Sequence, residues 1–286
     1  MDVAVEEKQE ASPALPHETL ITAGNLPLRT IFGELFGYRD LVRFFIRRDL
    51  KVRYRQTFLG VAWIVVQPFV SLVLFTVVFG RLAGMPSDGL RYEVFAISGL
   101  VIWTFFANGL TNSANSVVNN AALVSKVYFP RLAIPIAAIL SGLVDLLIAS
   151  GFMLAVLVYY GVDFSMRFLL IVPLTGLAIV ATFGVGFILS GLNVLYRDVR
   201  HLVPFLTQAW FFATPVVYPL SLFPEGARPF MALNPMVGVL EGFRWAVGAS
   251  SDPWSAIGLS CLSASVLAIL GVLTFTKAER RFADVI

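Results

Sequence analysis

The chain has 286 residues, of which 58% are hydrophobic and 14% are charged, and its formal net charge is +3. A soluble domain carries roughly a quarter charged residues, so this composition excludes an ordinary soluble globular protein. With a mean hydropathy of +0.81, it indicates a membrane protein that crosses the bilayer several times. The single cysteine, Cys261, excludes an internal disulfide framework and a cysteine metal site.

The first thirty residues have the composition of a tail. Glu6, Glu7 and Glu10 are acidic, and the apolar core of a secretory signal does not follow them. We therefore expect residues 1–30 to form a disordered cytoplasmic tail and residues 31–286 to form a single membrane domain.

A strongly basic stretch covers residues 38–58. Its basic residues, with Arg48 beside them, recur every four positions at Arg39, Arg43, Arg47, Lys51 and Arg55. On a helix they form one cationic stripe, opposite the apolar residues Tyr38, Leu41, Val42, Phe45 and Val52. The pattern predicts an N-terminal amphipathic helix in the membrane interface. The stripe has two interpretations that are compatible, namely attraction to anionic lipid and docking of a cytoplasmic protein.

Six apolar runs are long enough to cross roughly 30 Å of hydrocarbon, and they predict an all-α polytopic protein with six transmembrane helices. We place them at Leu59–Phe79, Val94–Leu110, Leu132–Tyr160, Phe168–Val194, Leu202–Leu220 and Trp254–Phe275. If the N-terminus is inside, sixteen of the 21 lysines and arginines lie in inner segments. The positive-inside rule therefore predicts that both termini are cytoplasmic.

The inner connection at residues 112–130 is unusually polar. Four asparagines precede the sequence ALVSKVYFP, at Asn112, Asn115, Asn119 and Asn120. The segment is too polar to cross the bilayer, so we expect a short helix along the membrane surface that ends at Pro130.

The outer connection between spans five and six, residues 221–250, contains NPMVGVLEGFRWAVG. Asn234 is suited to cap a helix, with Pro235 at its first position and Gly248 just past its end. This helix is too short to span, and such segments are re-entrant or interfacial. We expect a re-entrant helical hairpin that acts as a gate at the outer side.

Catalytic and metal sites are not indicated. His17 lies in the tail and His201 in a basic turn, so no catalytic triad or metal cluster can be proposed. The sequence has no GxxxxGK[ST] loop, and it therefore predicts no P-loop nucleotide site. Thr182, Gly186 and Ser190 instead have the four-residue spacing of a close helix-packing face.

Asp145 is the one acidic residue deep in a predicted span. A structural hydrogen-bonding role is favoured, because no second charge is predicted within a span to form an ion relay with it. Proton or ion coupling is the alternative. Gln67, Asn108 and Gln208 are further polar positions in predicted spans.

Aromatic residues are dense in and beside the predicted spans. They are typical of interfacial belts and lipid-facing packing. The functional alternative is a pore lined by amphipathic rings without charge, which would suit a sliding sugar polymer. The candidate pore-lining residues are Trp63, Gln67, Gln208, Trp210, Phe211, Thr214 and Tyr218.

Three segments resemble the permease subunits of ABC exporters that move O-antigen, capsule or teichoic-acid polymers. They are RDLKVRYRQTFLGVAWIVVQPF, NPMVGVLEGFRWAVG and ERRFADVI, and they occur in the order that the family has. The resemblance covers nearly the whole chain from about Tyr38. It implies a homodimer in the bacterial inner membrane, paired with two copies of a cytoplasmic ABC ATPase. ATP and magnesium would be bound by that ATPase, and this chain would bind no cofactor.

The resemblance also implies roles for particular residues. The interface helix would include Arg39, Arg43, Arg47, Arg48, Lys51 and Arg55. The coupling segment received by the ATPase would include Asn119, Asn120, Leu123, Lys126, Tyr128 and Phe129. The outer gate would include Phe230, Asn234, Glu241, Phe243, Arg244 and Trp245.

The leading functional hypothesis is a transmembrane subunit that passes a lipid-linked polysaccharide outward, driven by ATP hydrolysis in a partner. Its partners would be lipids and the polymer, and nucleic acid is not among them. The alternatives are a drug or lipid exporter permease, an integral-membrane transferase acting on polyprenyl-linked sugars, and a proton-coupled carrier. The transferase would need clustered acids at one membrane face, and the carrier rests on Asp145 alone.

Overall fold

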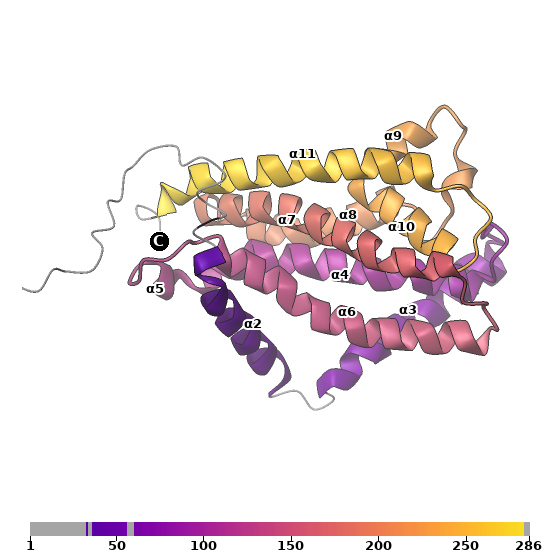
Figure 1. The fold of residues 1–286 in the computed structure, drawn as a ribbon, viewed down its shortest axis with the longest axis horizontal. Coiled ribbons are helices and arrows are strands. Elements are labelled where there is room, and N and C mark those ends of the chain that lie inside the picture. The colour runs from indigo at the N-terminus through magenta and orange to yellow at the C-terminus, as the bar shows by residue number, and fades with distance from the viewer. Residues whose placement is uncertain (1–32, 34–35, 56–59, 283–286) are drawn as a thin grey trace, which may run out of the picture.

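The computed structural model describes residues 33, 36–55 and 60–282, and every regular element in these ranges is a helix (Figure 1). Five helical stretches are long and apolar enough to cross a membrane: Gly60–Leu82, Tyr92–Asn119, Ala133–Tyr159, Met166–Leu195 and Trp254–Glu279. They correspond to five of the six expected spans, and the chain is a multi-pass membrane protein. The expected tail, residues 1–30, lies outside the described residues.

The elements follow one another as α2 (Arg39–Tyr54), η1 (Gly60–Ala62), α3 (Trp63–Phe75), η2 (Thr76–Leu82), α4 (Tyr92–Asn119), α5 (Ala121–Val124), α6 (Ala133–Tyr159), η3 (Met166–Leu170), α7 (Ile171–Leu195), α8 (Val199–Ala213), η4 (Leu220–Leu222), α9 (Arg228–Ala232), α10 (Pro235–Ala246) and α11 (Trp254–Glu279). The first spanning stretch therefore joins η1, α3 and η2, where η2 is a π-helix. The fourth joins η3 and α7.

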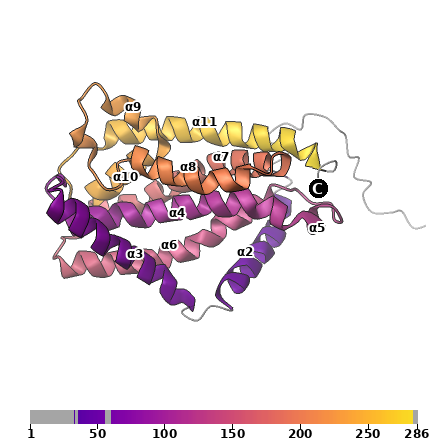
Figure 2. The ribbon, with the colours of Figure 1, turned by 180° about the vertical axis from the view of Figure 1, so that it is seen from behind.

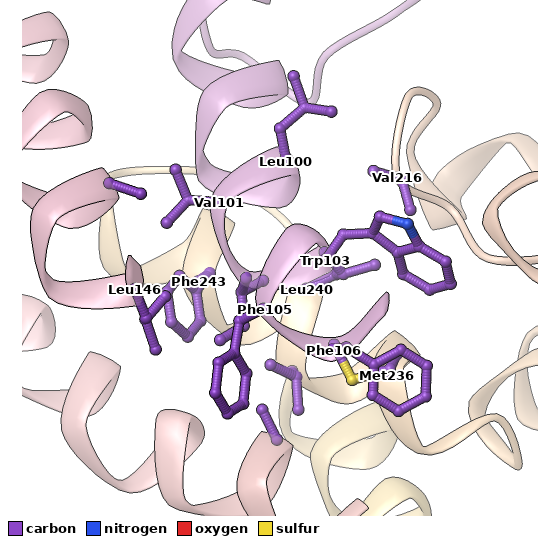
Figure 3. Packing of buried hydrophobic residues seen from close by; sticks show 14 of the residues in the cluster. Leu100, Val101, Trp103, Phe105, Phe106, Leu146, Val216, Met236, Leu240 and Phe243 are labelled. Carbon is purple, nitrogen blue, oxygen red and sulfur yellow. The ribbon is translucent and has the colours of Figure 1, made fainter. Parts of the chain in front are cut away.

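Helix α4 is the centre of the bundle. In its most apolar stretch 78% of the residues are buried, against 17% to 33% in the other four spans. Figures 1 and 2 show α4 running through the bundle, with α6 and α7 along one side and α3 and α8 along the other. Its side chains Trp103 and Phe106 lie near Met236 and Leu240 of α10 (Figure 3).

Close contacts between small residues bring the long helices together. A Cβ on Gly271 of α11 would lie 2.3 Å from the carbonyl oxygen of Gly184 on α7, so these two backbones touch. A Cβ on Gly186 would lie 2.8 Å from Oγ of Ser113 on α4. The packing face predicted for this part of α7 is confirmed. Apolar side chains gain little by leaving lipid tails for a protein interior, so membrane helices associate through close contacts between small residues.

The polar segment after the second span is more helical than expected. Instead of ending near Leu110, α4 continues to Asn119, and the expected surface helix is reduced to the four residues of α5. The polar side chains remain compatible with a helix because they bond to preceding turns, as Asn115 does to the carbonyl of Thr111 at 2.9 Å. Asn193 of α7 adds a bond of 2.8 Å to the carbonyl of Ala114.

The expected fifth span, residues 202–220, contains a shorter helix. Helix α8 has 15 residues and ends at Ala213. Thr214 is extended, with φ −108° and ψ 139°, because the following Pro215 disfavours a helical conformation in the residue before it. Residues beyond this point form turns and the short helix η4.

Candidate functional site

One end of the bundle, which we call the basic end, gathers α2, the connection at residues 120–132 and the C-terminal part of α11 (Figure 1). An apolar cluster joins these segments. Phe45 of α2 is 1% exposed and its ring lies 5.9 Å from that of Phe129. Phe282, which is fully buried, lies 5.6 Å from the ring of Phe275 in the same cluster. Three segments that the sequence analysis treated separately therefore form one packed unit.

Two arginines reinforce this unit with polar contacts. Arg48 donates a hydrogen bond of 2.8 Å to the side-chain oxygen of Asn120, and its guanidinium lies 4.9 Å from the centre of the Phe45 ring. Arg131 donates a bond of 2.8 Å to the backbone oxygen of Glu279. Because bonds to charged donors are stronger than neutral ones, these contacts fix α2 and α11 to the connection between α4 and α6.

The structure divides the candidate coupling residues between the interior and the surface. Phe129 is 5% exposed and belongs to the internal cluster, while Asn120 is held by Arg48. Leu123 is half-buried. Asn119, Lys126 and Tyr128 are exposed, so they remain available to a partner.

Most of the cationic stripe on α2 is exposed. This is the case for Arg39, Arg43, Arg47, Lys51 and Arg55, whereas Arg48 is half-buried. On the expected apolar face, Phe45 is buried in the internal cluster, and Leu41 and Val42 are half-buried against it. Val52 is 73% exposed and lies outside the cluster, which is compatible with an apolar side chain directed toward lipid.

A second feature, the polar cavity, lies where the end of α2 meets α3, α4 and α6. Its volume is about 190 Å³. Val101, Phe105 and Leu146 form part of its apolar lining, and Figure 3 shows them where α4 faces α6. Its polar lining consists of Arg53, Tyr54, Trp63, Gln67, Thr104, Asn108 and Asp145.

Asp145 is bound from α2 by two side chains. Arg53 forms an ion pair with it, and the hydroxyl of Tyr54 donates a hydrogen bond to its other oxygen. Arg53 also donates a bond of 3.4 Å to the hydroxyl of Ser141, one turn earlier on α6. Burial, and then the hydrogen bond to Asp145, raises the pKa of Tyr54 to about 12, so its hydroxyl remains a donor at neutral pH.

Asp145 therefore has a charged neighbour, although no second charged residue lies beside it within a predicted span. Its partner comes from the amphipathic helix and not from another span, so the search within spans missed Arg53 and Tyr54. The structural hydrogen-bonding role predicted for Asp145 agrees with these contacts. The combination of one intramembrane acid with an arginine in the preceding amphipathic helix is the signal that could have identified the pair.

The candidate pore-lining residues do not form one surface in the single chain. Trp63 and Gln67 line the polar cavity, whereas the span-five candidates do not. Trp210 packs edge-on against Phe106 at 5.2 Å, and Phe211 stacks on Phe75 at 5.6 Å. Of the remaining three, Gln208 is exposed, Thr214 is buried and Tyr218 is half-buried.

At the opposite end of the bundle, α10 has the predicted boundaries. The side chain of Asn234 accepts a bond of 3.1 Å from the backbone of Met236, and Pro235 occupies the first turn. Gly248 follows the helix with φ +112°, a conformation that glycine adopts readily. The amide of Asn234 also donates a bond of 2.8 Å to Thr214.

Half of the six candidate gate residues lie inside the protein. Glu241, Phe243 and Arg244 are 3%, 0% and 0% exposed, because α10 packs against α4, α7 and α11. Phe230 on α9 is 75% exposed. Trp245 is half-buried, between the ring of Trp254 and the guanidinium of Arg167.

Among the residues that the structure describes, Arg244 is the largest fully buried side chain. It forms an ion pair of 2.9 Å with Glu241 and donates a bond of 2.7 Å to the backbone oxygen of Val216. Its guanidinium lies 3.6 Å from the centre of the Phe95 ring on α4. Arg244 therefore joins α10, the turns after α8, and α4, a connection that the sequence did not indicate.

Within the described ranges, the structure contains no group of three His, Cys, Asp or Glu side chains that could hold a metal ion. The two candidate functional arrangements are the basic end and the polar cavity. The former offers exposed cations on a rigid unit, and the latter offers hydrogen-bonding groups within the bundle.

Comparison with known proteins yields a family match over residues 40–247, to the model described as ABC-2 type transporter. An O-antigen export system permease protein RfbA of Klebsiella pneumoniae is 28% identical over 263 residues, which are 92% of this chain and the full length of that protein. A protein of the same name from Myxococcus xanthus is 32% identical, over 74% of this chain and 81% of that protein. The polysialic acid transport protein KpsM of Escherichia coli is 24% identical, over 70% of this chain and 78% of that protein.

Proposed function

The chain belongs to the ABC-2 type transporter family, and we propose that it is the transmembrane subunit of an ATP-driven exporter that passes a lipid-linked polysaccharide across the bacterial inner membrane. The observation that carries the polymer assignment is the similarity to an O-antigen export permease along that protein's full length. The similarity to a polysialic acid transport protein supports the same class of substrate. A drug or lipid exporter and a transferase have no comparable support.

The proposed partner is an ABC ATPase on a separate chain, present in two copies. The sequence has no P-loop, so in an ATP-driven exporter another chain would bind and hydrolyse the ATP. The basic end is suited to receive it, because Lys126 and Tyr128 are exposed on a connection whose base is fixed by Phe129. A push on this connection would move α2 as well, since Arg48 and Phe45 hold the two together.

The movement would reach the middle of the bundle along α2. Arg53 and Tyr54, at the end of that helix, bind Asp145 near the middle of α6. An ATPase that closes on nucleotide would thus bias a two-state rearrangement of the spans, as rigid helices do in other transport and switching proteins. The arginine stripe would lie near the membrane surface and attract anionic lipid or the pyrophosphate of a lipid carrier.

The proposed assembly is a homodimer of six-span subunits with both termini cytoplasmic. Helix α8 would provide the fifth crossing, since its 15 residues rise about 22 Å and the turns after Thr214 continue the path. Apolar side chains exposed on α3 and α8 are suited to a partner subunit as well as to lipid, among them Phe69, Leu74, Phe205 and Phe212. The segment from η4 to α10 would form the outer gate.

The proposal can be tested by deleting the gene and restoring it from a plasmid. We expect the deletion to remove polysaccharide from the cell surface and to leave lipid-linked polymer inside, and the plasmid to restore export. The tagged chain should also co-purify with an ATPase that has a Walker motif. Normal surface polysaccharide in the deletion strain would contradict the assignment.

A further inference from the structure

The polar cavity contains hydrogen-bonding groups that have no partner in the described part of the chain. The indole N–H of Trp63 and the side-chain amides of Gln67 and Asn108 line the cavity, and none of them bonds to another described residue. All three lie in helices that are apolar enough to cross the membrane. All three side chains are exposed in the single chain. Lipid tails cannot satisfy such groups, so a polar occupant of the cavity would stabilise them.

The charge of the cavity favours a neutral occupant. Its one cation, Arg53, is already paired with its one anion, Asp145. A phosphate would add a negative charge beside Asp145 without a free cation to compensate it, which is unfavourable away from water.

The unpartnered groups match hydroxyl groups in particular. The amides of Gln67 and Asn108 each donate and accept hydrogen bonds, as a hydroxyl does. Thr104 uses its proton on the carbonyl of Leu100 at 2.7 Å, which leaves its oxygen free to accept. Trp63 is 54% exposed and adds an apolar ring with a polar edge, suited to a molecule that has C–H faces and hydroxyl edges.

We propose that the polar cavity binds one neutral sugar ring of the transported polymer. This inference rests on the proposed function and adds a location and a ligand class to it. The volume of about 190 Å³ is below the range of about 300–1,000 Å³ that holds drug-sized ligands, so it suits a single ring. Because α2 supplies Arg53 and Tyr54 to the wall, a movement of the basic end changes the shape of the subsite.

The test uses a single-cysteine reporter in the complete transporter, with its ATPase, in lipid nanodiscs. Cys261 is replaced by serine and Asn108 by cysteine, and the rate of reaction with N-ethylmaleimide is measured. The probe is the strain's own surface polysaccharide, released from its lipid and dephosphorylated. We expect labelling to slow about tenfold at ten times the Kd of the polymer, because about one site in eleven is then empty. Thr104→Cys is a second reporter in case Asn108→Cys does not assemble.

Native Cys261 provides the matched control, since it is exposed on α11 and does not line the cavity. Its labelling rate should not change when the polymer is added. Unchanged labelling of both cavity reporters would overturn the inference and indicate a cavity that holds only water. Protection by a polyprenyl phosphate without sugar would also overturn it, in favour of a lipid site.

The export assay separates this inference from the proposed function. We expect Asn108→Leu to lower surface polysaccharide several-fold while the protein level is unchanged. Normal export by Asn108→Leu in a strain that depends on this chain would overturn the sugar subsite and leave polymer export intact. If the amount of surface polysaccharide did not depend on the wild-type chain at all, the proposed function itself would be wrong.

Discussion

Arg53, at the end of α2, forms an ion pair with Asp145, near the middle of α6, across 92 positions of the sequence. The pair joins the amphipathic helix to a membrane-spanning helix at a point distant from the basic end. At that end, Arg48 and Asn120 join the same helix to the connection before α6. Helix α2 is therefore fixed at two places, which makes it suited to transmit a displacement.

Replacing Arg53 by leucine should destabilise the protein, because it leaves the carboxylate of Asp145 without its cation. The two side chains are 30% and 22% exposed, so we expect a loss of about 1–3 kcal/mol, less than for a fully buried pair. The double change Arg53→Leu with Asp145→Leu should recover part of it. Thermal unfolding of the purified protein measures this, and Arg55→Leu, at an exposed position of the same stretch, should have little effect. A double variant less stable than both single variants would contradict the pairing.

Tyr54→Phe should weaken the attachment of α2 to α6 without altering how the protein's stability depends on pH near neutrality. The pKa of Tyr54 is raised to about 12 by burial and by the bond to Asp145, above its ordinary value of 10.0. The stability that its hydroxyl contributes is therefore fully present below pH 10 and is lost only as the pH rises toward 12. We expect the stability difference between Tyr54→Phe and the wild type to be constant from pH 6 to pH 9, as measured by thermal unfolding. A difference that changes across this range would assign the titration to another group.

Local patterns in the sequence predicted the elements that local interactions determine. The start of α10 at Pro235, capped by Asn234, and the glycine after its end are correct, because capping depends on neighbouring residues. The position of five spans is correct, since length and hydropathy determine it. The end of α8 could also have been predicted, because Pro215 disfavours a helical Thr214.

Contacts between distant segments could not be predicted from periodicity. The hydrophobic pattern of α2 does not indicate that the internal apolar cluster includes Phe45 and leaves Val52 outside it. The resemblance placed Arg244 in the outer gate, and the sequence did not indicate that its helix packs against α4, α7 and α11. Both contacts were missed for one reason: the neighbouring helix determines burial, and the sequence of a single helix does not identify its neighbour.

Reversal of charge on the exposed stripe should stop export without preventing membrane insertion. Arg47 and Lys51 are exposed on α2 and lie outside the apolar cluster. In the double variant Arg47→Glu with Lys51→Glu, we expect the ATPase or anionic lipid to be repelled and surface polysaccharide to be lost. Western blots of the membrane fraction and surface polysaccharide measure insertion and export. The matched change to glutamine should retain part of the activity, and normal export by the glutamate variant would exclude a role for the stripe.

Replacing Arg244 by methionine should be among the most destabilising single changes. It would leave Glu241 buried without a cation, and breaking a buried pair in this way costs about 3–5 kcal/mol. Arg244→Lys should not restore stability, because an ammonium cannot reproduce the bond to Val216 together with the flat contact on Phe95. Arg81→Met, at an exposed position, removes the same charge as a control. A fully stable Arg244→Lys protein, by thermal unfolding in detergent, would show that the planar contacts are unimportant.

Gly271→Ala should force α11 away from α7. The added methyl group would lie 2.3 Å from the carbonyl oxygen of Gly184, and a backbone atom cannot turn aside as a side chain can. We expect a loss of about 1–3 kcal/mol, as for other overpacked interiors, measured as a lower midpoint of thermal unfolding. Gly258→Ala is the matched control, because it lies on the same helix and its methyl group would meet nothing within 4 Å. In that control the gain in helix propensity should make the change neutral or slightly stabilising. Equal effects at the two glycines would mean that the contact between α7 and α11 does not limit stability, and that helix propensity alone explains both.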